Sequence, residues 1–217
     1  MQKPQRLAVL LATIAAAIAL SAPALAHPHV FVTSKSEIVF DASGKVTAIR
    51  HFWTFDEMYS SFAAQGIAKD GKVATRADFA PLAKENAGSL AEFHYFTVLK
   101  INGKPVEFGE VTDYWMEETP AHLLNFHVEL PLKTPVAPGK FLSLQVYDPE
   151  FYIAFDFDEK VPPAMVGAPK GCSISSGKPD ELKPEEKGKL TESFFSGLSP
   201  GAGFGLKMAG HATVACP

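Results

Sequence analysis

The residues best suited to chemistry form the tripeptide His27-Pro28-His29, which directly follows a small-residue segment ending at Ala26. Cleavage after Ala26 would give a terminus whose α-amine and His27 imidazole can close a chelate ring on one metal ion. His29 adds a third nitrogen, because residues two apart in an extended chain point to the same side. Imidazole is a good ligand for Zn²⁺, Ni²⁺, Co²⁺ and Cu²⁺. The sequence therefore predicts a transition-metal site at the mature N-terminus.

Pro28 excludes one binding mode that a free terminus could offer. The square-planar copper and nickel motif with His in third position also needs the amide nitrogen of the second residue, and proline has no N–H. A metal held here must recruit further ligands from the fold, and we expect Asp148 or Glu57 to complete the site. The alternative is a frayed terminus whose composition merely suits signal cleavage.

Both expected carboxylates also have a structural interpretation. Asp148 follows the predicted strand 141–147 on its apolar side, where a carboxylate needs a partner. That partner is a metal ion in one interpretation and the backbone of the following turn in the other. Asp56 and Glu57 stand where a strand gives way to a helix, and we expect Asp56 to be the N-cap, which leaves Glu57 the freer of the two.

The other five histidines carry weaker signals. His122 is in phase with the apolar residues that follow it, so we expect a core histidine. His127 has the opposite phase, so we expect it in solvent. His51 shares a face with aromatic neighbours and should pack beneath them. The sequence does not place His94 or His211, and it leaves open whether any of the five joins the metal site.

The first 26 residues have the pattern of a secretory signal. Lys3 and Arg6 precede an apolar run over 7–20, and Ala24-Leu25-Ala26 is an A-x-A cleavage site. A membrane anchor is the competing interpretation, but the apolar run is shorter than the roughly 20 residues that span a bilayer. We therefore expect cleavage after Ala26 and a soluble periplasmic product without stable membrane insertion.

Cleavage would leave 191 of the 217 residues, with 18 basic and 24 acidic side chains and a formal charge of −6. Mild acidity argues against nucleic acid or anionic lipid as the main partner. The two cysteines, Cys172 and Cys216, would reach an oxidising compartment. A disulfide between them is expected to tether the tail and to stabilise the fold by roughly 3–4 kcal/mol. Their spacing does not suit the close cysteine pairs of zinc sites.

The elements that would position these residues are mostly strands. Turn-bounded, alternating segments rich in β-branched and aromatic residues predict a mostly-β fold, an antiparallel β-sandwich. The predicted strands are 30–40, 46–55, 95–101, 111–117, 122–130, 141–147 and 151–157. We expect one sandwich domain over 27–160 with a helical insertion at about 56–93. A disulfide-tethered tail over 161–217, with one helix at 184–198, should pack on the same domain.

The order of these motifs resembles a widespread family of periplasmic proteins of unknown function. The resemblance covers nearly the whole mature chain and rests on five features: His27-Pro28-His29-Val30-Phe31-Val32, Trp53-Thr54-Phe55-Asp56-Glu57-Met58-Tyr59-Ser60, Tyr95-Phe96-Thr97, Tyr147-Asp148-Pro149-Glu150-Phe151-Tyr152-Ile153 and the late Cys172. Members are typically encoded beside inner-membrane permeases of the nickel/cobalt type, and some are regarded as zinc-binding uptake partners. The resemblance implies a periplasmic metal-binding accessory of an inner-membrane metal permease. It does not transfer a ligand set.

Zinc is the preferred ion, with nickel, cobalt and copper as alternatives, because amine, imidazole and carboxylate form an N/O donor set without thiolates. No Ser-His-Asp arrangement or paired acid/base motif stands out, so we do not expect an enzyme. Two rival functions stay open. One is a copper carrier or copper oxidase that uses the N-terminal histidine, and the other is a non-metal interaction module built on the aromatic segments 53–62 and 147–157. The direction of transport and the oligomeric state are not set by the sequence.

Overall fold

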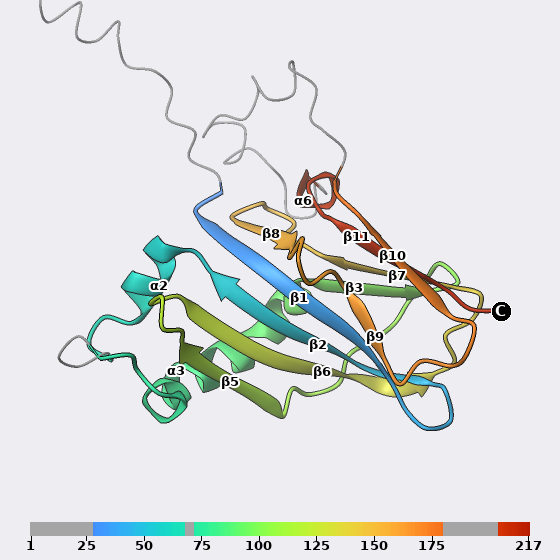
Figure 1. Ribbon diagram of the computed structural model, residues 1–217, viewed down its shortest axis with the longest axis horizontal. Coiled ribbons are helices and arrows are strands. Elements are labelled where there is room, and N and C mark those ends of the chain that lie inside the picture. Colours follow the sequence, from blue (N-terminus) through green and yellow to red (C-terminus); the bar gives the residue numbers. More distant parts are fainter. Residues whose placement is uncertain (1–27, 68–71, 180–203) are drawn as a thin grey trace, which may run out of the picture. The chain divides into compact units, whose positions relative to one another are not determined.

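The computed structural model describes residues 28–67, 72–179 and 204–217. Two β-sheets and a small number of helices make up this part of the chain (Figure 1). The mostly-β prediction is confirmed. The predicted signal segment 1–26, His27 and the predicted helix 184–198 lie outside the described residues.

The first sheet has the strand order β5-β6-β2-β1-β8, with β9 also paired to β1. Its strands are β1 (Val30–Phe40), β2 (Val46–Phe55), β5 (Asp113–Glu118), β6 (Leu124–Val136), β8 (Ile153–Phe157) and β9 (Ala164–Val166). Pairing is antiparallel except where β8 and β9 run parallel to β1. These two parallel strands are a feature that the sequence pattern did not predict.

The second sheet is antiparallel throughout and has the order β10-β11-β7-β3-β4. Its strands are β3 (Thr97–Ile101), β4 (Lys104–Pro105), β7 (Phe141–Val146), β10 (Ser173–Gly177) and β11 (His211–Ala215). The tail therefore supplies β9, β10 and β11, although its Gly- and Pro-rich composition carried little strand signal.

The opening hairpin follows directly from the sequence. Even-numbered residues of β1 are buried and odd-numbered ones are more exposed, as a strand with one apolar face requires. At the turn, Asp41 Oδ1 accepts the backbone N–H groups of Ser43 (2.8 Å) and Lys45 (3.0 Å), and Gly44 takes a φ of +78°. Both predicted strands, 30–40 and 46–55, have the predicted bounds.

The core lies where the two sheets face each other. Ile49 and Phe126 of the first sheet and Leu142, Leu144 and Val214 of the second are at most 2% exposed and belong to one apolar cluster. Burial of this kind stabilises a fold by roughly 25 cal/mol per Å² of apolar surface.

The predicted helical insertion is present as α2 (Glu57–Ala63), α3 (Arg76–Ser89) and the 3₁₀ segment η1 (Leu90–Phe96), with a further short helix, α6 (Phe204–Lys207), in the tail. α3 lies along β5 (Figure 1) and begins at a capping box between Thr75 and Asp78. Within the predicted insertion, α3 ends at Ser89 and the chain continues as η1, where His94, Tyr95 and Phe96 take positive φ angles of 50°, 57° and 48°. The same three residues delay the strand expected from Tyr95 until Thr97.

The predicted disulfide between Cys172 and Cys216 is confirmed, with Cα atoms 4.2 Å apart. Within the described residues, no helix has both the length and the apolar character needed to cross a membrane.

Candidate functional site

The start of β1 is fixed by the loop that precedes β8. The backbone N–H groups of His29 and Val30 both donate to the carbonyl oxygen of Tyr152, at 2.9 Å and 3.3 Å. The His29 ring also packs on the Tyr152 ring, with centroids 4.6 Å apart. His29 therefore lies in a defined, half-buried position immediately before the first strand. The frayed-terminus interpretation does not hold for this residue.

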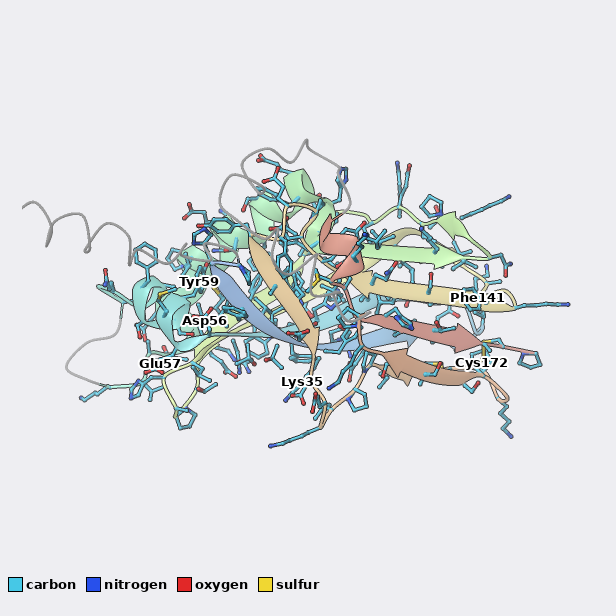
Figure 2. All side chains as sticks on the ribbon, turned by 90° about the horizontal axis from the view of Figure 1, so that it is seen from above. Lys35, Asp56, Glu57, Tyr59, Phe141 and Cys172 are labelled. Atoms are coloured by element: carbon cyan, nitrogen blue, oxygen red, sulfur yellow. A yellow bond between two sulfur atoms is a disulfide. The ribbon has the colours of Figure 1, made fainter. Side chains whose placement is uncertain are left out.

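The other side of the same strand is fixed by Asp56. Its Oδ2 accepts the N–H of Phe31 at 2.7 Å, and its own N–H donates to the Phe31 carbonyl at 2.9 Å. Asp56 Oδ1 accepts the N–H of Tyr59 at 2.9 Å, so the predicted N-cap is confirmed. Glu57, in the first turn of α2, is exposed (Figure 2).

Asp148 organises the loop between β7 and β8. The side chain is 8% exposed, and its two oxygens accept the N–H groups of Glu150 and Ile153, each at 3.0 Å. The start of α6 packs against this loop so closely that a Cβ atom on Gly205 would collide with the Asp148 carbonyl. The turn-capping interpretation of Asp148 is therefore confirmed. Each carboxylate oxygen retains a second lone pair, so a ligand role in addition stays a prediction.

Three of the four predicted ligands thus belong to segments that meet at one end of the first sheet. Asp56, beside Glu57, is hydrogen-bonded to Phe31, two residues after His29. Ile153, which Asp148 holds, is in register with Val30. No group of three or more His, Cys, Asp or Glu side chains arranged for a metal ion is found among the described residues. The predicted site includes His27, which lies outside them, so the site stays a prediction.

The donor chemistry at this end fits a borderline transition ion. His29 offers an imidazole and Glu57 an exposed carboxylate, and both groups are zinc, nickel or cobalt ligands. Asp148 fits best as the residue that orients the neighbouring loop. If His27 and the terminal amine supply the remaining nitrogens, the set matches an open N/O site rather than a closed thiolate site.

Replacing Asp148 with asparagine should lower the free energy of unfolding by about 1–3 kcal/mol. Asparagine has one acceptor oxygen in place of two, so one of the two part-buried N–H groups loses its acceptor and the other keeps only a neutral one. Urea unfolding at pH 7 measures this, with Asp158→Asn as the control because Asp158 likewise accepts two backbone N–H groups, from Lys160 and Val161, but in an exposed turn. An Asp148 variant no less stable than that control would show that the loop does not depend on this carboxylate.

Two comparisons with known proteins bear on the family of this chain. The sequence pattern of the family described as "Protein of unknown function (DUF1007)" matches residues 12–216. The chain belongs to the DUF1007 family. An uncharacterized protein of Haemophilus influenzae (strain ATCC 51907 / DSM 11121 / KW20 / Rd) is 27% identical over 166 residues, which cover 75% of this chain and 77% of the relative. Both descriptions leave the function open.

A second polar group of this DUF1007 protein lies in its core, where His51 joins the two sheets. The chain of contacts runs from Ser34 to Ser36 (3.0 Å), to His51 Nδ1 (2.9 Å), and from His51 Nε2 to Thr97 on β3 (3.1 Å). Because the Thr97 hydroxyl donates to the Tyr95 carbonyl at 2.7 Å, its oxygen accepts from His51 Nε2–H, and Nδ1 accepts from Ser36. His51 is fully buried and stacks on Trp53, as the sequence predicted. We call this buried hydrogen-bonded link between the two sheets the His51 staple. It offers no access to a metal ion.

Stability should depend on pH through His51. Burial, with a smaller contribution from the His127 charge, lowers the pKa of His51 to about 3. An unfolded histidine, with its pKa of about 6.5, binds a proton that the folded one does not, so stability is lost as pH falls from 6.5 toward 3. The loss from this residue should be about 2 kcal/mol between pH 7 and pH 5.

The check is urea unfolding at both pH values, for the wild type and for His51→Gln, which does not titrate. The variant should be less stable at pH 7 and should have a flatter pH dependence. Parallel pH profiles of the two proteins would contradict the assignment.

Two histidine predictions were wrong. His122 is 59% exposed and paired with Glu118 Oε1 at 2.7 Å, because β6 begins only at Leu124 and the apolar alternation of that strand does not extend back into the turn.

His127 does point to the outer face of the first sheet, but it is only 5% exposed. The rings of Phe52 and Trp115 on the adjacent strands cover it, with centroids 4.6 Å and 4.9 Å away. The alternation of side chains along one strand does not reveal that side chains of the neighbouring strands cover His127.

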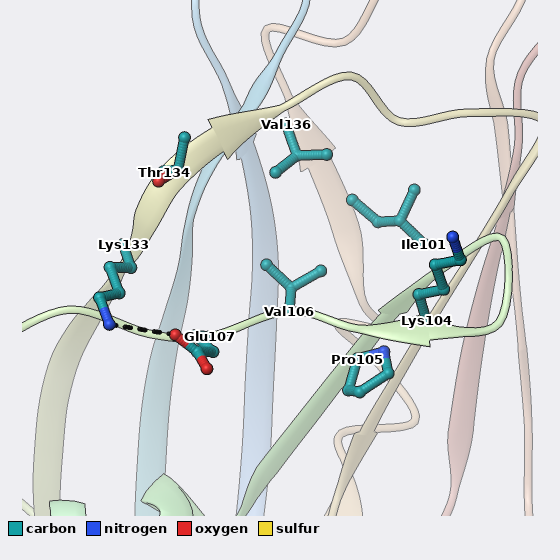
Figure 3. A pocket seen from close by; sticks show the side chains of 8 residues that line it. All are labelled: Ile101, Lys104, Pro105, Val106, Glu107, Lys133, Thr134 and Val136. Atoms are coloured by element: carbon teal, nitrogen blue, oxygen red, sulfur yellow. Dashed lines mark hydrogen bonds and ion pairs between the residues drawn. The ribbon is translucent and has the colours of Figure 1, made fainter.

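The pocket drawn in Figure 3 lies at the other end of the first sheet. It measures about 340 Å³, has an apolar floor that includes Ile101, Val106 and Val136, and carries a Lys133–Glu107 ion pair of 3.1 Å at its rim. Val136 is in register with Val46, at the end of β2 remote from Asp56. None of the predicted ligands lines this pocket, so it contributes nothing to the candidate metal site.

Proposed function

We propose that this protein is a periplasmic transition-metal-binding accessory of an inner-membrane metal permease, with zinc as the preferred ion and nickel or cobalt as alternatives. The observation that carries the proposal is that the segments containing His29, Glu57 and Asp148 meet at the start of β1. The backbone of His29 is held on one side by Tyr152, and the backbone of Phe31 is held on the other by Asp56. The start of β1, to which the terminal amine and His27 would be joined, is therefore held on both sides.

Periplasmic location is part of the proposal. Its support is the secretory pattern of the first 26 residues together with the disulfide, which forms and persists in oxidising compartments. The permease partner is supported by the family resemblance. Glu57, which follows the residue that is hydrogen-bonded to Phe31, supplies an exposed carboxylate, and a site that exchanges its ion keeps an open coordination position.

Calorimetric titration of zinc, nickel, cobalt and copper into protein processed by the cell tests this proposal. We expect one divalent ion to bind per chain, with affinity that falls as pH drops, because protons compete for the imidazoles and the amine. The matched control carries one additional methionine before His27, which converts the α-amine of His27 into an amide nitrogen. Metal affinity should then fall by about tenfold or more, because loss of a single partner of a metal ligand already costs about 10–100-fold. Absence of binding in the processed protein would contradict the proposal.

A further inference from the structure

The pocket of Figure 3 lies between the two sheets, and we call it the β4–β6 pocket. Its walls come from β3 and β4 in the second sheet, from the end of β6 in the first, and from the connection that follows β4. Its volume of about 340 Å³ is at the lower end of the range for small-molecule sites, about 300–1,000 Å³. A pocket of this size suits a small molecule better than a segment of a protein.

The walls of the β4–β6 pocket are held by backbone hydrogen bonds. Val106 N–H donates to the Leu99 carbonyl at 2.9 Å, which ties the connection after β4 to the second sheet. Lys133 N–H donates to the Glu107 carbonyl, also at 2.9 Å, which ties the same connection to the first sheet. The pocket is therefore formed by the fold itself, and a ligand that enters it needs to order little of the chain.

The floor of the β4–β6 pocket is apolar and continues the core. Ile101 is 7% exposed and belongs to the core cluster, while Val106 and Val136 are half-buried and pack against that cluster. A hydrocarbon chain laid on these three side chains would remove apolar surface from water, which favours binding. The floor therefore selects a ligand with an apolar part.

The rim of the β4–β6 pocket carries an excess of positive charge. Figure 3 shows the Lys133–Glu107 pair on one side of the floor and Lys104 on the other. Both members of the pair are mostly exposed, 69% and 79%, so their attraction is weak and the Lys133 ammonium group stays available to a ligand. Lys104 is exposed and forms no ion pair with the residues that the structure describes. Two ammonium groups and one carboxylate give the rim a net charge of +1.

The segments around the β4–β6 pocket have the same bias, although the chain as a whole has 20 basic and 24 acidic residues. The segments 100–107 and 133–140 together contain four lysines and one acidic residue. They lie side by side, because Asn102 N–H donates to the carbonyl of Phe141, just after the second segment, at 2.8 Å. The local field at this end of the molecule therefore attracts anions.

We propose that the β4–β6 pocket binds a small carboxylic acid with an apolar chain, such as a medium-chain fatty acid. The chain would lie on the apolar floor, and the carboxylate would lie beside the ammonium groups of Lys104 and Lys133. Thr134, at the same pocket, has a hydroxyl that can donate to the carboxylate. One carboxylate neutralises the rim charge, which a phosphate monoester with a charge of about −2 would exceed. The proposal does not depend on metal binding, because no predicted metal ligand lines the pocket.

Nuclear magnetic resonance titration of the processed protein tests the proposal with three probes of equal chain length: hexanoate, hexan-1-ol and hexylammonium. Hexanoate should shift the backbone amide signals within 101–107 and 133–136 and leave those of α2 unchanged. Hexan-1-ol should bind about fivefold more weakly or less, because it lacks the charge, and hexylammonium should bind more weakly still. From butanoate to hexanoate to octanoate, affinity should rise by up to about fourfold for each added CH₂ group.

Two variants that each remove two positive charges separate the rim from the rest of the surface. Lys104→Gln, Lys133→Gln changes the rim charge from +1 to −1, because Glu107 remains, so hexylammonium should now bind more tightly than hexanoate. The control Lys45→Gln, Lys170→Gln removes two exposed lysines that do not line the pocket, and it should keep the wild-type order of affinities. All four lysines are exposed, so both variants should fold.

Four results would overturn the proposal. Signal changes centred on α2 or spread evenly over the protein would place the ligand elsewhere. Equal affinity for hexanoate and hexan-1-ol would show that the pocket does not select an anion. A rim variant that still prefers hexanoate would show that Lys104 and Lys133 do not set the ligand class. Absence of signal changes with all three acids would show that the pocket is not a binding site for them.

Discussion

Zinc affinity is expected to fall by more than about 100-fold when His27 and His29 are both replaced with alanine. Loss of a single outer partner of a metal ligand already costs 10–100-fold, and this variant loses two imidazoles that would bind directly. The chelate ring of amine and imidazole is lost with His27. Calorimetry on protein processed by the cell measures the effect.

The control for this variant is His211→Ala. His211 is exposed on β11 in the second sheet, where no predicted ligand lies. It should bind zinc as the wild type does. Equal affinity in the wild type and in the double variant would show that the terminus is not the site, whatever the total binding.

Replacing Cys172 and Cys216 with serine should lower the free energy of unfolding by about 3–4 kcal/mol. The bond closes a loop between residues 44 apart in sequence, and the unfolded chain gains the corresponding entropy when the bond is lost. Cys172 immediately precedes β10 and Cys216 immediately follows β11, so the bond also joins the ends of an antiparallel pair at the sheet edge. Urea unfolding of the variant measures the loss.

Wild-type protein under reducing conditions should lose the same stability as the serine variant, and reduction should not change the variant further. A loss below about 1 kcal/mol would show that the β10–β11 edge holds without its covalent link. Alkylation before and after reduction reports whether the bond is present in protein taken from cells.

Strands with a simple alternating pattern could be predicted from the sequence. β1 and β2 have one buried face each and a turn defined by Asp41 and Gly44, so pattern and local geometry agree and the bounds are correct. β10 and β11 could not be found in this way. Their serine, glycine and alanine residues give weak alternation, and the pair depends on β7 and the disulfide for its place in the sheet.

Side-chain surroundings were predicted where they depend on local hydrogen bonds. The caps formed by Asp56 and Asp148 are contacts with residues at most five positions away, and the sequence indicated both. The His51 staple was missed as a network because its partners, Ser36 and Thr97, come from other strands. Their presence on otherwise apolar strand faces was the available signal.

The contacts around the start of β1 could not be predicted from the sequence either. Period and turn chemistry do not reveal that β8 pairs in parallel with β1, and this pairing is what brings the Asp148 loop to His29. Sequence reasoning selected the three described residues for their chemistry, and the topology places them at one end of one sheet.

The metal content of the protein isolated from its own host tests the central claim most directly. Elemental analysis of wild-type protein should find about one equivalent of zinc, nickel or cobalt per chain, because an open site of three nitrogens and one carboxylate binds one borderline ion. The His27→Ala, His29→Ala variant isolated in the same way should contain essentially none. Wild-type protein without metal, or a variant with the wild-type content, would contradict the account.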